Sequence, residues 1–316
     1  MKILVGSFFL AAALFVVSPP VAVADIFGTG ANQFTIDFVT IGNPNNPPDP
    51  TGDPTNAGSV PYVYRMGKFE ISADMTYKAS IEGQSNYGGQ SGLNRPVTGI
   101  TWDTAARFVN WLNTSSGYTP AYKFNDGSFE LWQPTDVGFN PNNLFRNSKA
   151  YYFLPSEDEW YKAAYYDPAA GLYYDFPTGS NSVPDGIDSP GDEEFEVVFD
   201  DGFHQQWPND ITNVGVLSPY GTAGQGGNVW EMLETEFDLV NDLTFGRRSI
   251  RGGPWTTFVP DYMRSTSREW HNPQASVSQT IGFRVASGAP IPEPSSVAVC
   301  LIGGLFLLSN VRLQHR

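Results

Sequence analysis

The sequence predicts one large domain that combines a few helices with short strands and long irregular loops. Two stretches have the spacing of an amphipathic helix, residues 103–113 and the run after residue 156. Alternating apolar and polar residues indicate short strands at 34–38 and 62–71. The remaining sequence shows no internal repeat and no strong linker, so we expect a single unit between the two terminal segments.

Residues 1–24 are predicted to be a secretory signal peptide. Lys2 precedes an uncharged, mostly apolar run, and Ala22-Val23-Ala24 forms a small-residue cleavage site, which would leave Asp25 as the mature N-terminus. The alternative is an uncleaved membrane anchor. The short run and the good cleavage site favour the signal peptide.

Residues 288–316 form a second sorting element in this interpretation. A small-residue linker leads to Pro292-Glu293-Pro294, and an uncharged run from Ser295 to Val311 is followed by Arg312 and Arg316. The run is at the short end of the roughly 17 to 25 residues of a membrane-spanning helix. The arginines would keep its far end in the cytoplasm.

This tail resembles the PEP-CTERM sorting signal of Gram-negative bacteria. The resemblance implies export, transient anchoring in the inner membrane, processing by an exosortase, and release or attachment at the cell surface. An ordinary C-terminal membrane anchor is the alternative. The position of Pro292, Glu293 and Pro294 directly before the apolar run favours sorting.

Cysteine content and charge fit an exported protein. The single cysteine, Cys300, lies in the tail, so the domain contains no disulfide. The chain has 18 Lys+Arg against 33 Asp+Glu, a formal net charge of −15. Such a charge repels nucleic acid and anionic lipid. It suits contact with divalent cations, although solubility explains it equally well.

The region 25–60 is predicted to hold one strand and a loop. Phe34, Ile36 and Phe38 alternate with polar residues, and the run 43–54 is rich in proline, asparagine and aspartate. The aspartates of this loop could hold calcium, but the prolines alone account for its composition. The main domain is expected at 61–287.

The second predicted helix has a clear N-terminal signal. Ser156 and Glu159 form an S-x-x-E capping box, in which each side chain bonds an amide at the helix start. Trp160 and Ala163 begin the buried stripe. Acidic residues at a helix start also favour the positive end of its dipole, which explains Glu157 without a catalytic role. The acidic stretch 173–213 is expected to be mostly a solvated loop.

Three motifs organise the C-terminal half: Gly226-Gly227-Asn228-Val229-Trp230-Glu231, Arg251-Gly252-Gly253-Pro254-Trp255 and Ile281-Gly282-Phe283-Arg284-Val285. Paired glycines allow a tight turn, and the tryptophan that follows is expected to be buried. If buried, Glu231 requires a cation or hydrogen-bond donors, and Arg284 requires an anion or hydrogen-bond acceptors.

These motifs, in this order, resemble the formylglycine-generating-enzyme family, also called the sulfatase-modifying-factor domain. The strand near Met66-Gly67-Lys68 and the Leu154-Pro155 helix start resemble further family segments. The resemblance implies an irregular α+β fold related to C-type lectins, with few helices, short antiparallel strands and long loops. The alternative is that the motifs are generic turns that bury an aromatic residue.

The same resemblance implies calcium sites. It makes Gly227 and Val229 carbonyl ligands and Glu231 the carboxylate ligand, while Gly224 stands where the family has Asn or Asp. Calcium takes about 6 to 8 oxygens, so the missing side chain weakens the site. The alternative is that backbone amides satisfy Glu231. A second calcium loop is implied at Asp201 and Phe203.

Catalysis is where the sequence departs from the family. Family enzymes bind copper through two cysteines just after the Gly-Gly-x-Trp strand, but the run 256–264 contains none. Threonine cannot replace a thiolate as a soft ligand, so no copper is expected. The three histidines, His204, His271 and His315, fit no iron or serine-triad motif. We therefore expect non-catalytic binding of a peptide or glycan. The alternative is a diverged oxidoreductase or protein-modifying enzyme.

Overall fold

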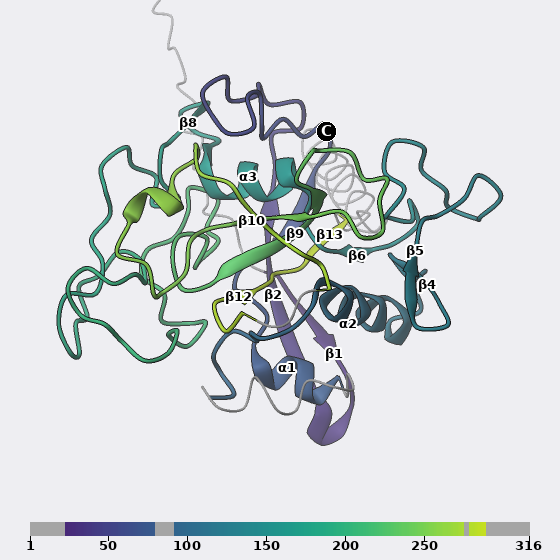
Figure 1. The fold of residues 1–316 in the computed structure, drawn as a ribbon, viewed down its shortest axis with the longest axis horizontal. Coiled ribbons are helices and arrows are strands. Elements are labelled where there is room, and N and C mark those ends of the chain that lie inside the picture. The colour runs from purple at the N-terminus through teal and green to yellow at the C-terminus, as the bar shows by residue number, and fades with distance from the viewer. Residues whose placement is uncertain (1–22, 80–91, 275–277, 289–316) are drawn as a thin grey trace, which may run out of the picture.

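The computed structural model describes residues 23–79, 92–274 and 278–288. Within these ranges, short strands and helices are joined by long loops that form the outer parts of the molecule (Figure 1). Two larger sheets supply most of the regular structure. The tail residues Pro292, Glu293 and Pro294 and the predicted apolar run lie outside the described residues. No helix in the described part is long and apolar enough to cross a membrane.

The first sheet has five strands in the order β1-β2-β3-β13-β6, and all neighbours are antiparallel. Its members are β1 (Val23–Phe27), β2 (Phe34–Ile41), β3 (Tyr64–Gly67), β13 (Ala286–Gly288) and β6 (Tyr152–Phe153). The alternation predicted at 34–38 is confirmed, because Phe34, Ile36 and Phe38 are buried. Strand β2 pairs with β3, so the region 25–60 completes the main sheet of the domain.

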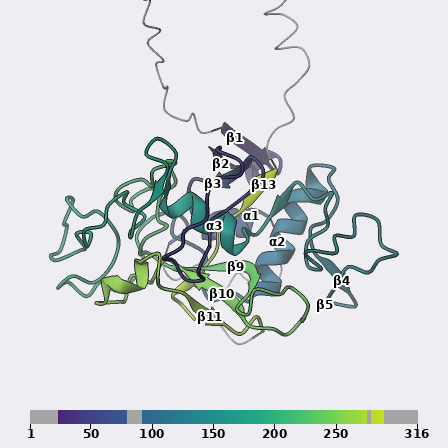
Figure 2. The same cartoon turned by 90° about the horizontal axis from the view of Figure 1, so that it is seen from above.

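The second sheet has four strands in the order β11-β10-β9-β12. These are β11 (Glu269–His271), β10 (Arg248–Arg251), β9 (Trp230–Glu236) and β12 (Ile281–Gly282). Every residue of β9 is buried, and its short pairing with β12 is parallel. Figure 2 shows β1–β3 on one side of the molecule and β9–β11 on the other. Two small hairpins complete the strands: β4 (Lys123–Asn125) with β5 (Ser128–Glu130), and β7 (Tyr166–Asp167) with β8 (Leu172–Tyr173).

Both predicted helices are present. Helix α2 (Trp102–Ser115) covers the predicted run 103–113, and Thr101 caps its first turn. Helix α3 (Glu157–Tyr165) begins with the predicted capping box of Ser156 and Glu159. A further short helix, α1 (Ala73–Lys78), was not predicted, because six residues are too few to display a helical period.

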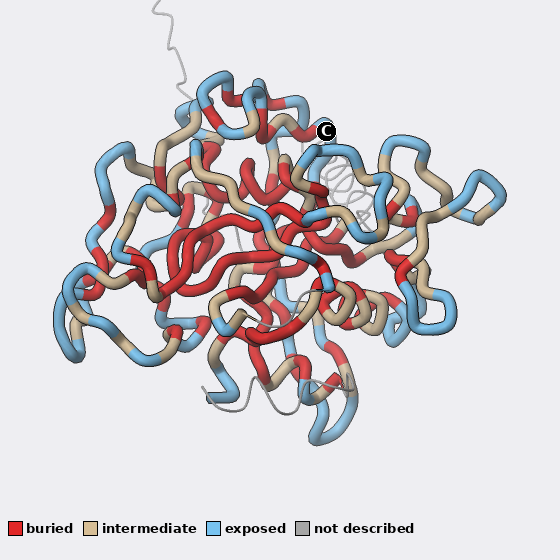
Figure 3. Tube along the Cα trace, viewed as in Figure 1, coloured by how far each residue is buried: buried red, intermediate tan, exposed pale blue. Residues whose placement is uncertain are grey.

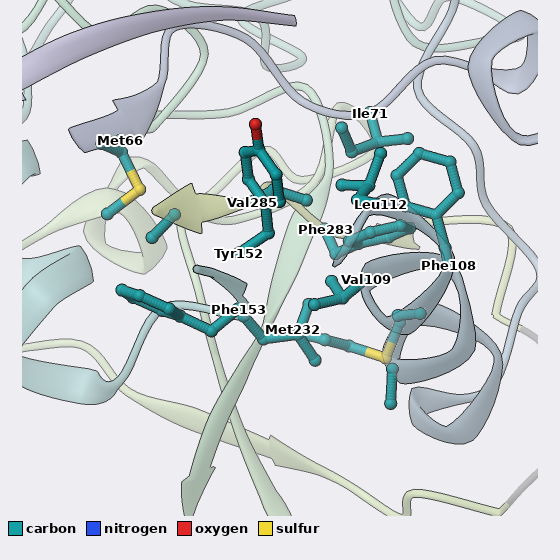
Figure 4. Packing of buried hydrophobic residues seen from close by; sticks show 14 of the residues in the cluster. Met66, Ile71, Phe108, Val109, Leu112, Tyr152, Phe153, Met232, Phe283 and Val285 are labelled. Atoms are coloured by element: carbon teal, nitrogen blue, oxygen red, sulfur yellow. The ribbon is translucent and has the colours of Figure 1, made fainter. Parts of the chain in front are cut away.

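The main core lies where α2 meets both sheets. Phe108, Val109 and Leu112 of α2 face Met232 of β9 and Phe283 in the close-up view (Figure 4). Figure 3 shows that the buried chain forms one central region, while the outer loops are exposed. The packing of Met232 and Phe283 in this core therefore holds β9 and the segment after β12, which carry two of the C-terminal motifs, in place.

The expectation of a solvated loop at 173–213 is only partly right. Residues 174–229 form no helix or ladder strand, but Phe176, Phe195, Val198 and Phe199 are buried. These side chains build two small clusters apart from the main core. The acidic residues of the stretch stay largely at the surface, so the segment is a packed loop with an acidic exterior.

Candidate functional site

The Gly226-Gly227 turn places the start of β9. Gly227 has a φ of 73°, and a Cβ at this position would lie 2.3 Å from the carbonyl oxygen of Val198. Only glycine fits both constraints. The turn leads directly into Trp230 and Glu231, which are both buried, as the sequence predicts.

Glu231 and Arg284 form a fully buried ion pair. Arg284 donates from Nε to Oε2 and from Nη2 to Oε1 of Glu231, both at 2.5 Å. The indole nitrogen of Trp160 donates to Oε2 at 2.8 Å. Glu231 thus supplies the acceptor that Arg284 needs, and Arg284 supplies the cation that Glu231 needs. Side chains rather than backbone amides form the hydrogen bonds of the Glu231 carboxylate.

Glu70 lies beside this pair. It is fully buried, its Oε1 accepts from Nδ2 of Asn228 at 2.9 Å, and its Oε2 has no partner among the described residues. Burial, together with the charge of Glu231, raises the pKa of Glu70 to about 8 against the opposing effect of Arg284. One arginine thus faces two carboxyl groups, and the raised pKa keeps Glu70 largely protonated at neutral pH.

This geometry bears on the calcium prediction. Neither oxygen of Glu231 is free of a hydrogen bond, so a calcium ion would have to displace the Arg284 guanidinium. Gly227 and Val229 lie in the turn as expected, and all three residues are buried. Calcium at Gly227, Val229 and Glu231 stays a prediction that a titration can test.

The second implied calcium loop lies elsewhere on the surface. Asp201 is exposed, whereas Phe203 is half-buried and packs against the cluster that contains Val229. No group of three or more His, Cys, Asp or Glu side chains in the described residues could hold a metal ion. The structure therefore places the Asp201 carboxylate in solvent and Glu231 in the interior. This second site also stays a prediction.

The segment 256–264, where the family resemblance would place cysteines, follows Trp255 directly. It contains a 3-10 helix, Pro260–Met263, and the ring of Tyr262 packs edge-on against Trp230 at 5.5 Å. The Thr257 hydroxyl accepts from the Val259 amide at 3.0 Å, so it stabilises the turn. Phe258 is 78% exposed. This exposed side chain lies at the surface, and the segment contains no cysteine.

The sequence analysis missed a second set of buried charges at the start of α3. Glu157 binds Arg251 and also accepts from Arg268 at 3.1 Å. Glu159 pairs with Arg146, which also donates to Glu234 at 2.7 Å. The helix dipole explains why acids occur there, but these acids also bind specific arginines. The sequence showed only that acidic residues cluster at the start of this helix, and it did not show which arginines they bind.

Comparison with known proteins identifies the family. Residues 55–289 match the model of the sulfatase-modifying factor enzyme 1-like domain, FGE-sulfatase. The chain belongs to this family. No curated protein matches the FGE-sulfatase chain by sequence.

Solved structures show the same fold. The Treponema denticola variable protein 1 superimposes with a TM-score of 0.59 at 18% identity, covering 84% of this chain and 99% of that chain. CarF superimposes with a TM-score of 0.53 at 19% identity, covering 80% and 98%. The α+β, C-type-lectin-like fold of the FGE-sulfatase family is thus confirmed, and at these identities the likeness extends to the fold alone.

The predicted signal-peptide junction falls within β1. Ala24 pairs with Asp37, and Asp25 pairs with Ile36. The Asp25 carboxylate binds both terminal nitrogens of Arg65, and the Tyr152 hydroxyl donates to it at 2.7 Å. Asp25 therefore belongs to the fold, and Val23 and Ala24, which cleavage would remove, pair in the same strand. Cleavage between Ala24 and Asp25 stays a prediction.

Proposed function

We propose that this FGE-sulfatase chain is an exported, non-catalytic protein that binds a peptide or glycan at the cell surface or in the extracellular matrix. One observation carries the proposal. The segment where family enzymes hold copper contains no thiol, and Thr257 uses its hydroxyl within the turn. Threonine does not supply the soft ligand that copper oxidation of a substrate requires.

Charge and the terminal segments support the exported location. A net charge of −15 keeps the chain off nucleic acid and anionic lipid. The N-terminal signal peptide would deliver it to the export machinery. The tail with Pro292, Glu293 and Pro294 would anchor it transiently in the inner membrane until an exosortase processes it.

The experiment is a direct test for the family's chemistry. The purified chain, loaded with copper, is incubated with a sulfatase peptide that contains the target cysteine, and the peptide is analysed by mass spectrometry. We expect the cysteine to remain unmodified. Aldehyde formation above a no-protein control would instead support a diverged oxidoreductase.

A further inference from the structure

A cavity lies at the far end of β9, apart from the Gly-Gly turn. Its volume is about 280 Å³, just below the roughly 300–1,000 Å³ range of small-molecule pockets. Four separate segments build its walls: the loop 54–57, residues 142–143, the start of α3 and the loop that follows β9. In Figure 1 the loop after β9 approaches the helix α3 near the top of the view.

Partly buried hydrogen bonds hold the walls in place. Asn241 donates from Nδ2 to Oδ1 of Asn143 at 3.0 Å, and Asn143 in turn bonds Glu234. The Gly58 amide, next to the loop 54–57, donates to Oδ1 of Asp158 at 2.8 Å and so links that loop to the start of α3. These bonds hold the cavity preformed, which lowers the entropic cost of binding.

Several polar groups of the cavity remain available. The side chains of Thr55, Asn56 and Asn142 make no hydrogen bond within the described residues, and Oδ2 of Asp158 also has no partner there. An asparagine amide both donates and accepts, and a carboxylate accepts twice. A ligand that matches this set must carry several groups that both donate and accept.

Hydroxyl groups meet this requirement better than charged groups do. An anion would face the Asp158 carboxylate, which has no paired arginine among the described residues. An ammonium ion only donates, so it would leave the amide donors of Asn56 and Asn142 unpaired. The charges of Glu157 and Glu159 are already neutralised by arginines.

Leu239 adds an apolar side chain to the cavity, and its backbone conformation is unusual. It is 46% exposed and has a φ of 72°, a left-handed conformation that is unfavourable for a bulky side chain. The fold therefore holds an exposed leucine at the cavity in a strained position. A sugar ring offers one apolar face for such a side chain and hydroxyls for the amides.

We propose that this cavity binds a neutral saccharide of about one sugar residue, with Asn142 and Asp158 bonding its hydroxyls and Leu239 contacting its apolar face. The inference rests on the proposed binding function and gives it a ligand class and a location.

The test uses the purified full-length chain and saturation-transfer NMR with D-glucose, D-galactose, D-mannose and N-acetyl-D-glucosamine. At least one should bind. Asn142→Ala should weaken binding about two- to tenfold, the effect of one lost hydrogen bond. Asn125→Ala, an exposed asparagine on the β4–β5 hairpin, should leave it unchanged.

Leu239→Gly separates binding from stability. Glycine relieves the strained backbone, so the melting temperature should not fall while sugar affinity does. The inference is overturned if no saccharide binds, if Asn125→Ala weakens binding as much as Asn142→Ala, or if n-butylamine binds in place of sugars. Aldehyde formation in the copper assay is a separate result that addresses the non-catalytic function and not this cavity.

Discussion

Glu70 should make the stability of this protein fall as pH rises. Its carboxyl group is fully buried beside Glu231 and Arg284, and its pKa is raised to about 8 from an ordinary value of 4.5. The folded state therefore holds a proton that the unfolded state releases. The stabilisation is complete below pH 4.5 and is lost as the pH rises through about 8.

The magnitude follows from linkage. Each pH unit between the two pKa values changes the free energy of unfolding by about 1.4 kcal/mol. Over the interval from 4.5 to about 8 the upper limit is about 5 kcal/mol. Glu70→Gln mimics the protonated carboxyl, because an amide keeps the oxygen that accepts from Asn228 and does not titrate.

Urea unfolding at pH 5 and pH 8.5 measures the effect. Parent and Glu70→Gln should be similarly stable at pH 5, and the variant should be more stable than the parent at pH 8.5. Other titrating groups, including Asp158 with a pKa of about 6, affect both proteins and cancel in the comparison. Glu193→Gln, an exposed control, should follow the parent. An equal stability difference between parent and Glu70→Gln at both pH values would refute the reasoning.

Three further results are expected. Glu231→Gln leaves the buried Arg284 without its partner charge and should cost about 3 to 5 kcal/mol of unfolding free energy in urea. A melting temperature that rises with millimolar calcium in the parent and not in this variant would support the predicted calcium site, and an unchanged parent would argue against it. Ser156→Ala removes the α3 cap and should cost about 1 kcal/mol, whereas an unchanged midpoint would contradict that role. Replacing Pro292 and Glu293 with alanine should trap full-length protein in the inner membrane, and normal processing on an immunoblot would argue against sorting.

The sequence was informative where the signal is local. The capping box needs only Ser156 and Glu159, three positions apart, and the alternation around Ile36 needs only its neighbours. The Gly227 turn was visible for the same reason, since its φ of 73° is a property of one residue.

Contacts between side chains that are far apart in the sequence could not be predicted from local patterns. Glu231 and Arg284 were each recognised as buried charges, but nothing local showed that they bind each other or that Trp160 completes the pair. The position of Glu70 was missed because its environment comes from Asn228 and Arg284, which are remote in the chain. The saccharide cavity is assembled from four distant segments and has no sequence motif of its own.

The position of β13 in the first sheet has a consequence for how the chain reaches its folded state. Residues 286–288 lie between β3 and β6, so the sheet stays in two pieces until almost the whole domain has been synthesised. Contacts between such remote segments slow folding, because a long loop must close before they form. A ribosome-bound chain therefore cannot complete this sheet early, and if the chain is exported as proposed, it would reach the export machinery before this sheet has closed.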